Sequence, residues 1–341
     1  MSTIFIDERS QIALKNNHRP WYNEIGKDPE NYNFHEYENN KDVQTIQEYS
    51  NVLLSKYGSM ILVTTGEKII HGYGGQFFPI TNNNQIKLYD NIITFSGYWS
   101  SGVWHFPMET LVNLRTIFNK IPTELRKQYY LYFDEISNTD KNWIDLFSQE
   151  LSKFAGILTS ASLSDNNIIA SKLLAPQRPR FGNPNSKQIE WLKDHIWRKL
   201  NLSETGRQTC IILIKRNFLR VLKNFSEVQK EVSKFAELTN LELYIHDDKN
   251  LPPFEEQLKI FHKARYVIGS HGAGAVNLLA CHGEQKTTFV EFLNLTDINI
   301  CYLRLAKFLE INYYSVPIFN NDKACLETLE NFTKLEQSRL S

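Results

Sequence analysis

The sequence lacks several features by which common protein classes are recognised. Its four cysteines include no C-x-x-C pair, and none has a histidine in zinc-ligand spacing, so neither a disulfide framework nor a structural metal site is expected. Lysine and arginine together number 38, as do aspartate and glutamate, so there is no net charge to attract nucleic acid or an anionic membrane. Any phosphate group must therefore be bound by a local site.

Long apolar runs are absent as well. Charges occur within the first ten residues, no early segment resembles a signal peptide, and no run approaches the ~18 apolar residues of a membrane span. We therefore expect a cytoplasmic protein, or one domain of a larger chain. With 341 residues, of which 42% are apolar, the chain is long enough to form two domains.

The amino-terminal half has mixed patterning. Residues 1–55 are polar and aromatic without a clean period, and we expect an irregular arm there. Strand-like stretches follow at 59–65, 87–97 and 129–134, with a helical pattern at 103–120. Prolines concentrate in the segment 175–186, which is the expected linker. We predict an amino-terminal α/β domain over residues 1–175.

The carboxy-terminal half alternates strand and helix patterns regularly. Apolar strand patterns lie at 209–215, 241–246, 266–269, 287–293 and 312–318. Helical patterns of one to three turns separate them, which predicts right-handed βαβ units on a parallel sheet. We expect a Rossmann-like domain over residues 185–320 and an amphipathic helix within 321–341 that packs back across the molecule.

The loop G-S-H-G-A-G, residues 269–274, joins a predicted strand to a predicted helix. Ligands of parallel sheets bind beyond the carboxyl ends of the strands, and the free N–H groups of a helix start favour a phosphate. The order G-x-x-G-x-G is neither the dinucleotide fingerprint nor the P-loop. His271 would add a donor for a phosphate or a sugar hydroxyl; alternatively, it only caps the helix and the glycines serve packing.

Two further features are expected at the same edge of the sheet. Lys215, Arg216 and Arg220 follow a predicted strand, where they would either bind a diphosphate or form a solvated basic turn. Glu291 interrupts an apolar strand near its carboxyl end. Because an unpaired buried carboxylate is costly, Glu291 would either accept hydrogen bonds from ribose hydroxyls or form a structural ion pair.

A histidine and a carboxylate are spaced for contact at the start of the helical pattern 103–120. His105 and Glu109 are four residues apart and would share one helix face, and Pro107 is tolerated in a first turn. Such a pair is suited to remove a proton from a hydroxyl. The alternative is a core histidine whose hydrogen bonding is satisfied by Glu109.

Together these stretches resemble glycosyltransferase family 61. The resemblance covers roughly residues 95–320 and is carried by VWHFPMETLVNL, ILIKRNFLRVLKN, FEEQLKIFHKARYVIGSHGAGAVNLLA and FVEF. It implies a GT-B architecture, in which two Rossmann-like domains face a cleft. It also implies inverting transfer of a sugar, a pentose such as xylose or N-acetylglucosamine, from a UDP-linked donor to a hydroxyl of a glycan acceptor. No metal or other cofactor is implied, and the sequence has no D-x-D triplet to hold a metal diphosphate.

The resemblance also implies roles by position. Glu109, which stands where the family usually has aspartate, would be the catalytic base with His105 polarising it. The arginines and the amides after His271 would hold the diphosphate, His271 and Asn277 would line the donor site, and Glu291 would bind the ribose. The expected donor-binding set is Lys215, Arg216, Arg220, Ser270, His271, Gly272, Ala273, Gly274, Asn277 and Glu291. Eukaryotic members carry anchors or signals that this sequence lacks, which favours a microbial or virus-encoded enzyme.

Two other classes of function are alternatives to a transferase. A catalytically inactive nucleotide- or glycan-binding module would be free to lose the His105–Glu109 pair and the arginines, both of which are present. A nicotinamide-dependent oxidoreductase would need a glycine fingerprint after the first strand of the carboxy-terminal half, and L-I-K-R-N-F has none.

Overall fold

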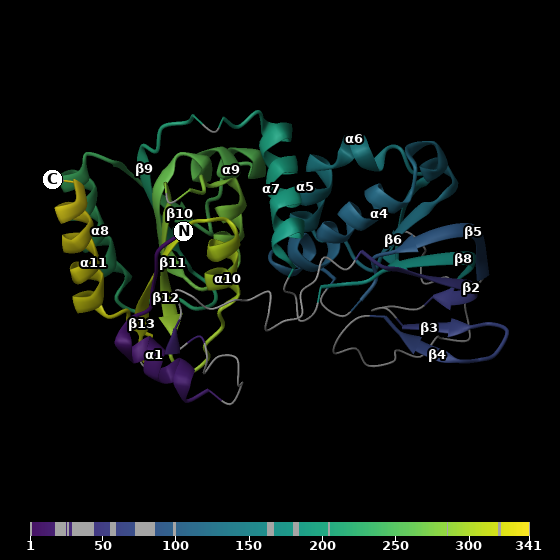
Figure 1. The fold of residues 1–341 in the computed structure, drawn as a ribbon, viewed down its shortest axis with the longest axis horizontal. Coiled ribbons are helices and arrows are strands. Elements are labelled where there is room, and N and C mark those ends of the chain that lie inside the picture. The colour runs from purple at the N-terminus through teal and green to yellow at the C-terminus, as the bar shows by residue number, and fades with distance from the viewer. Residues whose placement is uncertain are drawn as a thin grey trace. The chain divides into compact units, whose positions relative to one another are not determined.

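The computed structural model describes residues 2–17, 25, 27–28, 44–54, 59–71, 86–97, 100–161, 167–179, 184–203, 205–284, 286–319 and 322–340. They form an α/β fold with two sheets (Figure 1). The chain divides into two compact units: Met1–Asn40 with Lys193–Ser341, here called the parallel-sheet unit, and Lys41–Leu192, the mixed-sheet unit. Residues 1–40 thus group with the carboxy-terminal half, and not with the amino-terminal domain predicted over 1–175.

The parallel-sheet unit contains a six-stranded, wholly parallel sheet with the order β1-β13-β12-β11-β9-β10. Its strands are β1 (Ile4–Phe5), β9 (Cys210–Lys215), β10 (Glu242–Asp247), β11 (Ala264–Ser270), β12 (Thr288–Asn294) and β13 (Asn312–Ile318). The predicted strands of the carboxy-terminal half are all present. The central strands β9, β11 and β12 are almost wholly buried because helices cover both faces of the sheet.

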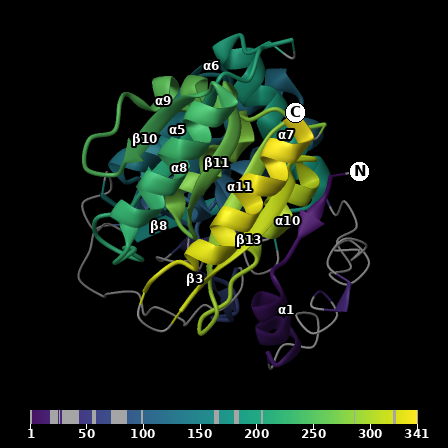
Figure 2. The ribbon, with the colours of Figure 1, turned by 90° about the vertical axis from the view of Figure 1, so that its left-hand side faces the viewer.

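The helices of this unit are α1 (Glu8–Lys15), α8 (Phe225–Thr239), α9 (Phe254–His262), α10 (Cys301–Phe308), α11 (Leu326–Leu340) and the 3₁₀ helix Ala273–Ala280. Helices α8 and α11 lie on one side of the sheet, and α9 and α10 lie on the other (Figure 1). Figure 2 shows α8 and α11 side by side. Their buried Val232 and Phe332 belong to one apolar cluster. The predicted last helix therefore packs on its own unit rather than back across the molecule.

The first residues of the chain complete the parallel sheet. Strand β1 pairs with β13, and the backbone N–H of Asp7 donates to Ser315 Oγ at 2.9 Å. Asp7 also caps α1 by accepting from the backbone N–H of Arg9. The irregular arm predicted over residues 1–55 is therefore regular where the structure describes it, at β1, α1 and the strand β2 (Ile46–Leu54).

The mixed-sheet unit has a seven-stranded sheet with the order β4-β3-β2-β8-β5-β6-β7. The remaining strands are β3 (Ser59–Leu62), β4 (Lys68–Ile70), β5 (Ile86–Thr94), β6 (Tyr130–Phe133), β7 (Gly156–Thr159) and β8 (Asn167–Pro176). Strands β8, β5, β6 and β7 are parallel, whereas β4, β3, β2 and β8 are antiparallel. Only part of this sheet therefore matches the second Rossmann-like domain that the resemblance implies.

The helical pattern predicted over 103–120 appears as three successive segments. A π-helix, Phe106–Thr110, leads into a 3₁₀ turn, Leu111–Asn113, and then into α4 (Leu114–Lys120). The unit also contains the 3₁₀ helix Thr123–Gln128, α5 (Asn138–Leu146) and α6 (Ser148–Leu151). Helix α7 (Ser186–Leu200) contains the boundary between the units. The predicted linker 175–186 ends β8 and begins α7, and its residues 180–183 lie outside the described part.

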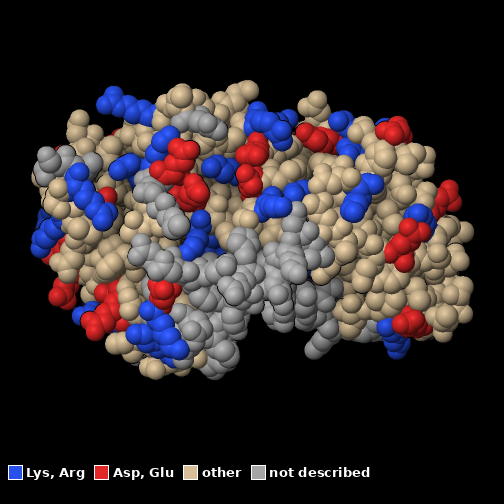
Figure 3. Space-filling model, in the orientation of Figure 1, with Lys and Arg blue, Asp and Glu red and all other residues tan. Residues whose placement is uncertain are grey.

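The surface shown in Figure 3 carries charged side chains of both signs. Basic and acidic side chains are interspersed on the face shown in Figure 3, as the balanced composition predicts. Within the described ranges, every helix is too short or too polar to cross a membrane.

Candidate functional site

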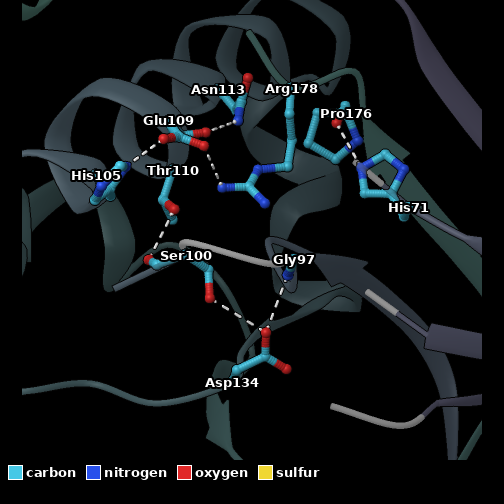
Figure 4. Close-up of polar contacts among 10 residues, drawn as sticks. All are labelled: His71, Gly97, Ser100, His105, Glu109, Thr110, Asn113, Asp134, Pro176 and Arg178. Carbon is cyan, nitrogen blue, oxygen red and sulfur yellow. Dashed lines mark hydrogen bonds and ion pairs between the residues drawn. The ribbon is translucent and has the colours of Figure 1, made fainter. Parts of the chain in front are cut away.

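The predicted contact between His105 and Glu109 is present at the start of the π-helix. His105 Nδ1 lies within hydrogen-bond distance of Glu109 Oε1 (Figure 4). The His105 side chain is 37% exposed, whereas that of Glu109 is 9% exposed, so the histidine faces solvent and the carboxylate lies behind it. π-helical turns are rare and occur mostly near functional sites. The Asn113 amide donates to the Glu109 backbone carbonyl at 2.6 Å, which helps to hold this wide turn.

Arg178, just after β8, binds the second carboxylate oxygen of Glu109. Its Nη2 lies 3.1 Å from Glu109 Oε2, and its side chain is only 3% exposed. The guanidinium also packs against Gly97, where an added Cβ would lie 1.8 Å from Arg178 Nη1. Burial lowers the pKa of Arg178, while the charges of Glu109 and Asp134 oppose that shift. The Glu109 carboxylate is thus held from two sides, by a histidine and by a buried arginine.

His71 holds the strand end that carries Arg178. Its Nε2 lies 3.0 Å from the Pro176 carbonyl oxygen, and the residue is 6% exposed. Burial lowers the pKa of His71 to about 4, and the nearby Arg178 charge contributes to the same shift. His71 is therefore neutral at pH 7, and its Nε2–H donates to the carbonyl.

Asp134 fixes the loop that leaves β5 toward His105. It follows β6, is 1% exposed, and accepts from Ser96 Oγ at 2.6 Å, from the Gly97 backbone N–H at 3.0 Å and from Ser100 Oγ at 3.2 Å. A carboxylate with three donors is well compensated for its burial. Tyr98 and Trp99 of this loop lie outside the described residues.

Asp140 holds the second part of the same loop. It accepts from Ser101 Oγ at 2.5 Å and from the Gly102 backbone N–H at 3.2 Å. It also forms a capping box with Ser137 at the start of α5, so one carboxylate ties that helix to the loop. Gly102 has φ of +107°, a conformation that favours glycine. The segment that presents His105 is therefore anchored by two buried carboxylates, Asp134 and Asp140.

In the parallel-sheet unit, a cavity of about 190 Å³ opens at the carboxyl ends of β11, β12 and β13. Its lining residues are Arg220, Val221, Leu222, Ser270, His271, Phe292, Leu293, Asn294, Asp297, Asn299, Ile318 and Asp322. The chain runs from β9 to β10 on one side and continues with β11 on the other side of β9. The strand order therefore reverses between β9 and β11. Open parallel sheets bind ligands at such a reversal, beyond the carboxyl ends of the strands.

The G-S-H-G-A-G loop contributes Ser270 and His271 to this cavity. His271 Nδ1 lies 2.7 Å from Glu291 Oε1, and Tyr313 donates its hydroxyl to Glu291 Oε2 at 2.7 Å. Glu291 has no exposed surface. In this structure the Glu291 carboxylate contacts His271 and Tyr313, and its predicted contact with a ribose stays a prediction.

The predicted basic residues after β9 have different surroundings. Arg216 packs on the glycine loop, where a Cβ at Gly272 would lie 1.8 Å from its Nη1, and its Nε is 3.5 Å from Asp248 Oδ2. Lys215 Nζ instead binds Asp247 Oδ2 at 2.9 Å, which lowers the pKa of Asp247 to about 2. Lys215 is therefore engaged by a neighbouring strand end and is not among the residues that line the cavity.

Arg220 is the exposed cation of the cavity lining. Its φ of +55° is a left-handed conformation, which is uncommon for a residue with a side chain and occurs often at functional sites.

Two other residues predicted to bind the donor are not among those that line the cavity: Gly274 and Asn277. Asn277 is 3% exposed and donates to Gln257 Oε1 at 3.4 Å, so its place in the donor site stays a prediction. Gly274 lies beside the His246 ring, and only the backbone of Ala273 is described.

Sequence reasoning missed several residues that shape both sites. Asp134 had a signal, because an acidic residue ends the predicted strand 129–134. Arg178 and Tyr313 had none, since their partners are distant in the sequence. Within the described ranges, no group of three or more histidine, cysteine, aspartate or glutamate side chains is arranged to hold a metal ion.

Comparison with known proteins gives one finding. The family model described as Glycosyltransferase 61 matches residues 103–290, more than half of the chain. The match begins two residues before His105 and ends one residue before Glu291. No curated protein matches the chain.

Proposed function

The chain belongs to glycosyltransferase family 61 and is a glycosyltransferase, and from this premise we propose the reaction that it catalyses. The donor is a UDP-linked sugar, a pentose such as xylose or N-acetylglucosamine, and the acceptor is a hydroxyl of a glycan. Transfer inverts the anomeric centre and requires no metal. The GT-B arrangement that the resemblance implies is part of the same proposal.

His105 is the general base of this reaction, and Glu109 holds it. The Arg178–Glu109–His105 chain is the observation that carries the assignment. Glu109 is 7% exposed and is engaged by both neighbours, whereas His105 reaches solvent. A carboxylate behind Nδ1 orients the imidazole and stabilises the imidazolium that forms when Nε2 takes a proton. This reverses the roles expected from the sequence, in which Glu109 was the base.

The reaction is a direct displacement. The acceptor oxygen attacks the anomeric carbon while its proton passes to His105 Nε2, and the bond from that carbon to the diphosphate oxygen breaks. Negative charge then grows on the departing diphosphate. Arg220 and His271 at the cavity, with Arg216 behind the glycine loop, are suited to stabilise that charge. Removing one such donor typically lowers the rate by about 10²–10³-fold.

The test compares two variants in a transfer assay with a panel of UDP-sugars. If His105 is the base, His105→Gln abolishes transfer, while Glu109→Gln lowers kcat by a smaller factor; the reverse order would return the role of base to Glu109. Both variants should retain the thermal shift that UDP gives the wild type, with or without a chelator. Analysis of the product anomer by NMR tests inversion.

The same assay tests the alternative of an inactive binding module. Such a protein would bind UDP but neither transfer the sugar nor hydrolyse the donor in the absence of an acceptor.

A further inference from the structure

A buried chain of hydrogen bonds lies behind the wall of the cavity in the parallel-sheet unit. Tyr313 on β13 donates to Glu291 on β12, and Glu291 faces the ring of His271 at the end of β11. Both distances are 2.7 Å. Tyr313 is 2% exposed and Glu291 is fully buried, while His271 reaches the cavity.

We propose that Glu291 is a positioning residue for His271, held in place by Tyr313, and that this relay fixes the tautomer with which His271 meets the diphosphate of the donor. The inference rests on the proposed donor role of the cavity. It replaces the contact between Glu291 and a ribose that the resemblance implies.

The direction of each hydrogen bond follows from what the groups can donate. Burial, followed by the charge of Glu291, raises the pKa of Tyr313 well above its usual value, so the phenol keeps its proton and donates. The carboxylate can then only accept at its other oxygen. His271 Nδ1 must therefore carry the hydrogen that lies between it and Glu291 Oε1.

The remaining nitrogen of His271 meets a thiol and, in our proposal, the ligand. Cys301 Sγ lies 3.8 Å from Nε2, and burial raises the pKa of Cys301 well above its usual value, so it stays a thiol. The Tyr302 ring packs edge-on at 4.9 Å and fixes the plane of the imidazole. A phosphate oxygen can only accept, so the proposal places a hydrogen on Nε2 in the complex, while Glu291 accepts from Nδ1 on the other side of the ring.

Charged groups from the neighbouring elements act on the same place. The positive charges of Arg216 and Arg220, after β9, act on Tyr302, and the charge of Arg220 acts on Cys301. The ring of His271 thus has the Glu291 carboxylate behind it, and it shares the cavity lining with Arg220. A diphosphate in the cavity would bring negative charge to Arg220 and His271. A ribose there would have no access to Glu291, which is fully buried.

The test begins with the tautomer, which does not depend on any ligand. Long-range ¹H–¹⁵N spectra of protein labelled at histidine should show His271 with hydrogen on Nδ1, assigned by loss of its signals in His271→Asn. The Glu291→Met/Tyr313→Phe double variant removes both partners together, so that neither is left buried and unpaired. It should lose this fixed tautomer. A wild-type ring protonated only on Nε2 would overturn the proposal.

The second arm measures binding of inorganic pyrophosphate and of UDP by calorimetry. The double variant should weaken both by about tenfold, as expected for one charged hydrogen bond. In the His271→Asn background the same two changes should have no further effect, because a residue that acts through His271 has nothing left to act on. If the double variant weakens binding further in the His271→Asn background, the positioning role would be overturned.

Tyr266→Phe is the matched control, since Tyr266 is also a buried phenol of this sheet and donates to a carboxylate, Glu336, at 2.9 Å. It should leave pyrophosphate binding unchanged. If His271→Asn binds pyrophosphate as well as the wild type does, while the wild type shows the Nδ1 tautomer, then the donor role of His271 fails and the relay is only structural.

Discussion

Gly97→Ala should impair transfer by displacing Arg178, without removing any charged group. Gly97 lies after β5, and an added Cβ would be 1.8 Å from Arg178 Nη1, 2.8 Å from Cζ and 3.2 Å from Cδ. All three atoms belong to a side chain, so the guanidinium can retreat while the backbone stays in place. The backbone N–H of residue 97 can still donate to Asp134.

The size of the effect follows from the contact that is lost. Ordinary contact begins near 3.4 Å, so Nη1 must retreat by roughly 1.5 Å. The same movement would stretch the Nη2–Oε2 contact with Glu109, now 3.1 Å, beyond hydrogen-bond distance. At an effective dielectric constant near 20, this costs on the order of 2 kcal/mol of attraction. Because misplacement by ~1 Å can lower a rate by ~10²-fold, we expect kcat to fall by about 10–100-fold.

The assay is initial-rate transfer with UDP binding measured in parallel by calorimetry, and UDP affinity should not change. Gly156→Ala in the same sheet is the control, since its Cβ would meet Tyr130 at 3.4 Å, an ordinary contact. It should keep the wild-type kcat. Suppose that Gly97→Ala keeps the wild-type kcat although its crystal structure shows Arg178 displaced. That result would refute the idea that transfer depends on Arg178 holding Glu109.

Three further predictions concern the parallel-sheet unit. Arg220→Gly should be more stable than Arg220→Ala by about 1 kcal/mol in urea unfolding, because only glycine adopts φ of +55° without strain, and both variants should bind UDP more weakly by calorimetry. Burial lowers the pKa of His246 to about 4, so stability present above pH ~6.5 is lost as the pH falls toward 4. His246→Phe should remove on the order of 2 kcal/mol of that loss, measured by urea unfolding at pH 7.5 and 4.5. Lys215→Met should raise the pKa of Asp247 from about 2 toward its ordinary value, so less stability is lost between pH 4 and pH 2 in the same measurement.

The parallel sheet could be predicted because its signal is local. The runs 209–215 and 287–293 are mainly apolar, and strands buried on both faces read in this way. Strand β1 has only two residues, too few for any period, and its place beside β13 depends on contacts more than 300 residues away in the sequence. The sequence therefore predicted an irregular arm where the structure has a sixth strand.

The contact between His105 and Glu109 could also be predicted, since a spacing of four residues brings side chains together on any helical turn. The spacing did not indicate which of the two reaches solvent. That depends on Arg178, which is 69 residues from Glu109 and covers its second oxygen. Likewise, the position of Glu291 near a strand end predicted a ligand, while the neighbouring strand supplied Tyr313 as a donor instead.

The sequence by itself determined several local features of this protein: the strands and helices of its carboxy-terminal half, the glycine loop at a strand end and the pairing of His105 with Glu109. These follow from periodicity and spacing over a few residues. The tertiary structure alone decided which polar groups face a cavity and which face each other. Burial and hydrogen-bond partners arise when distant elements pack together, as β12 and β13 do around Glu291 and as β8 and the π-helix do around Glu109.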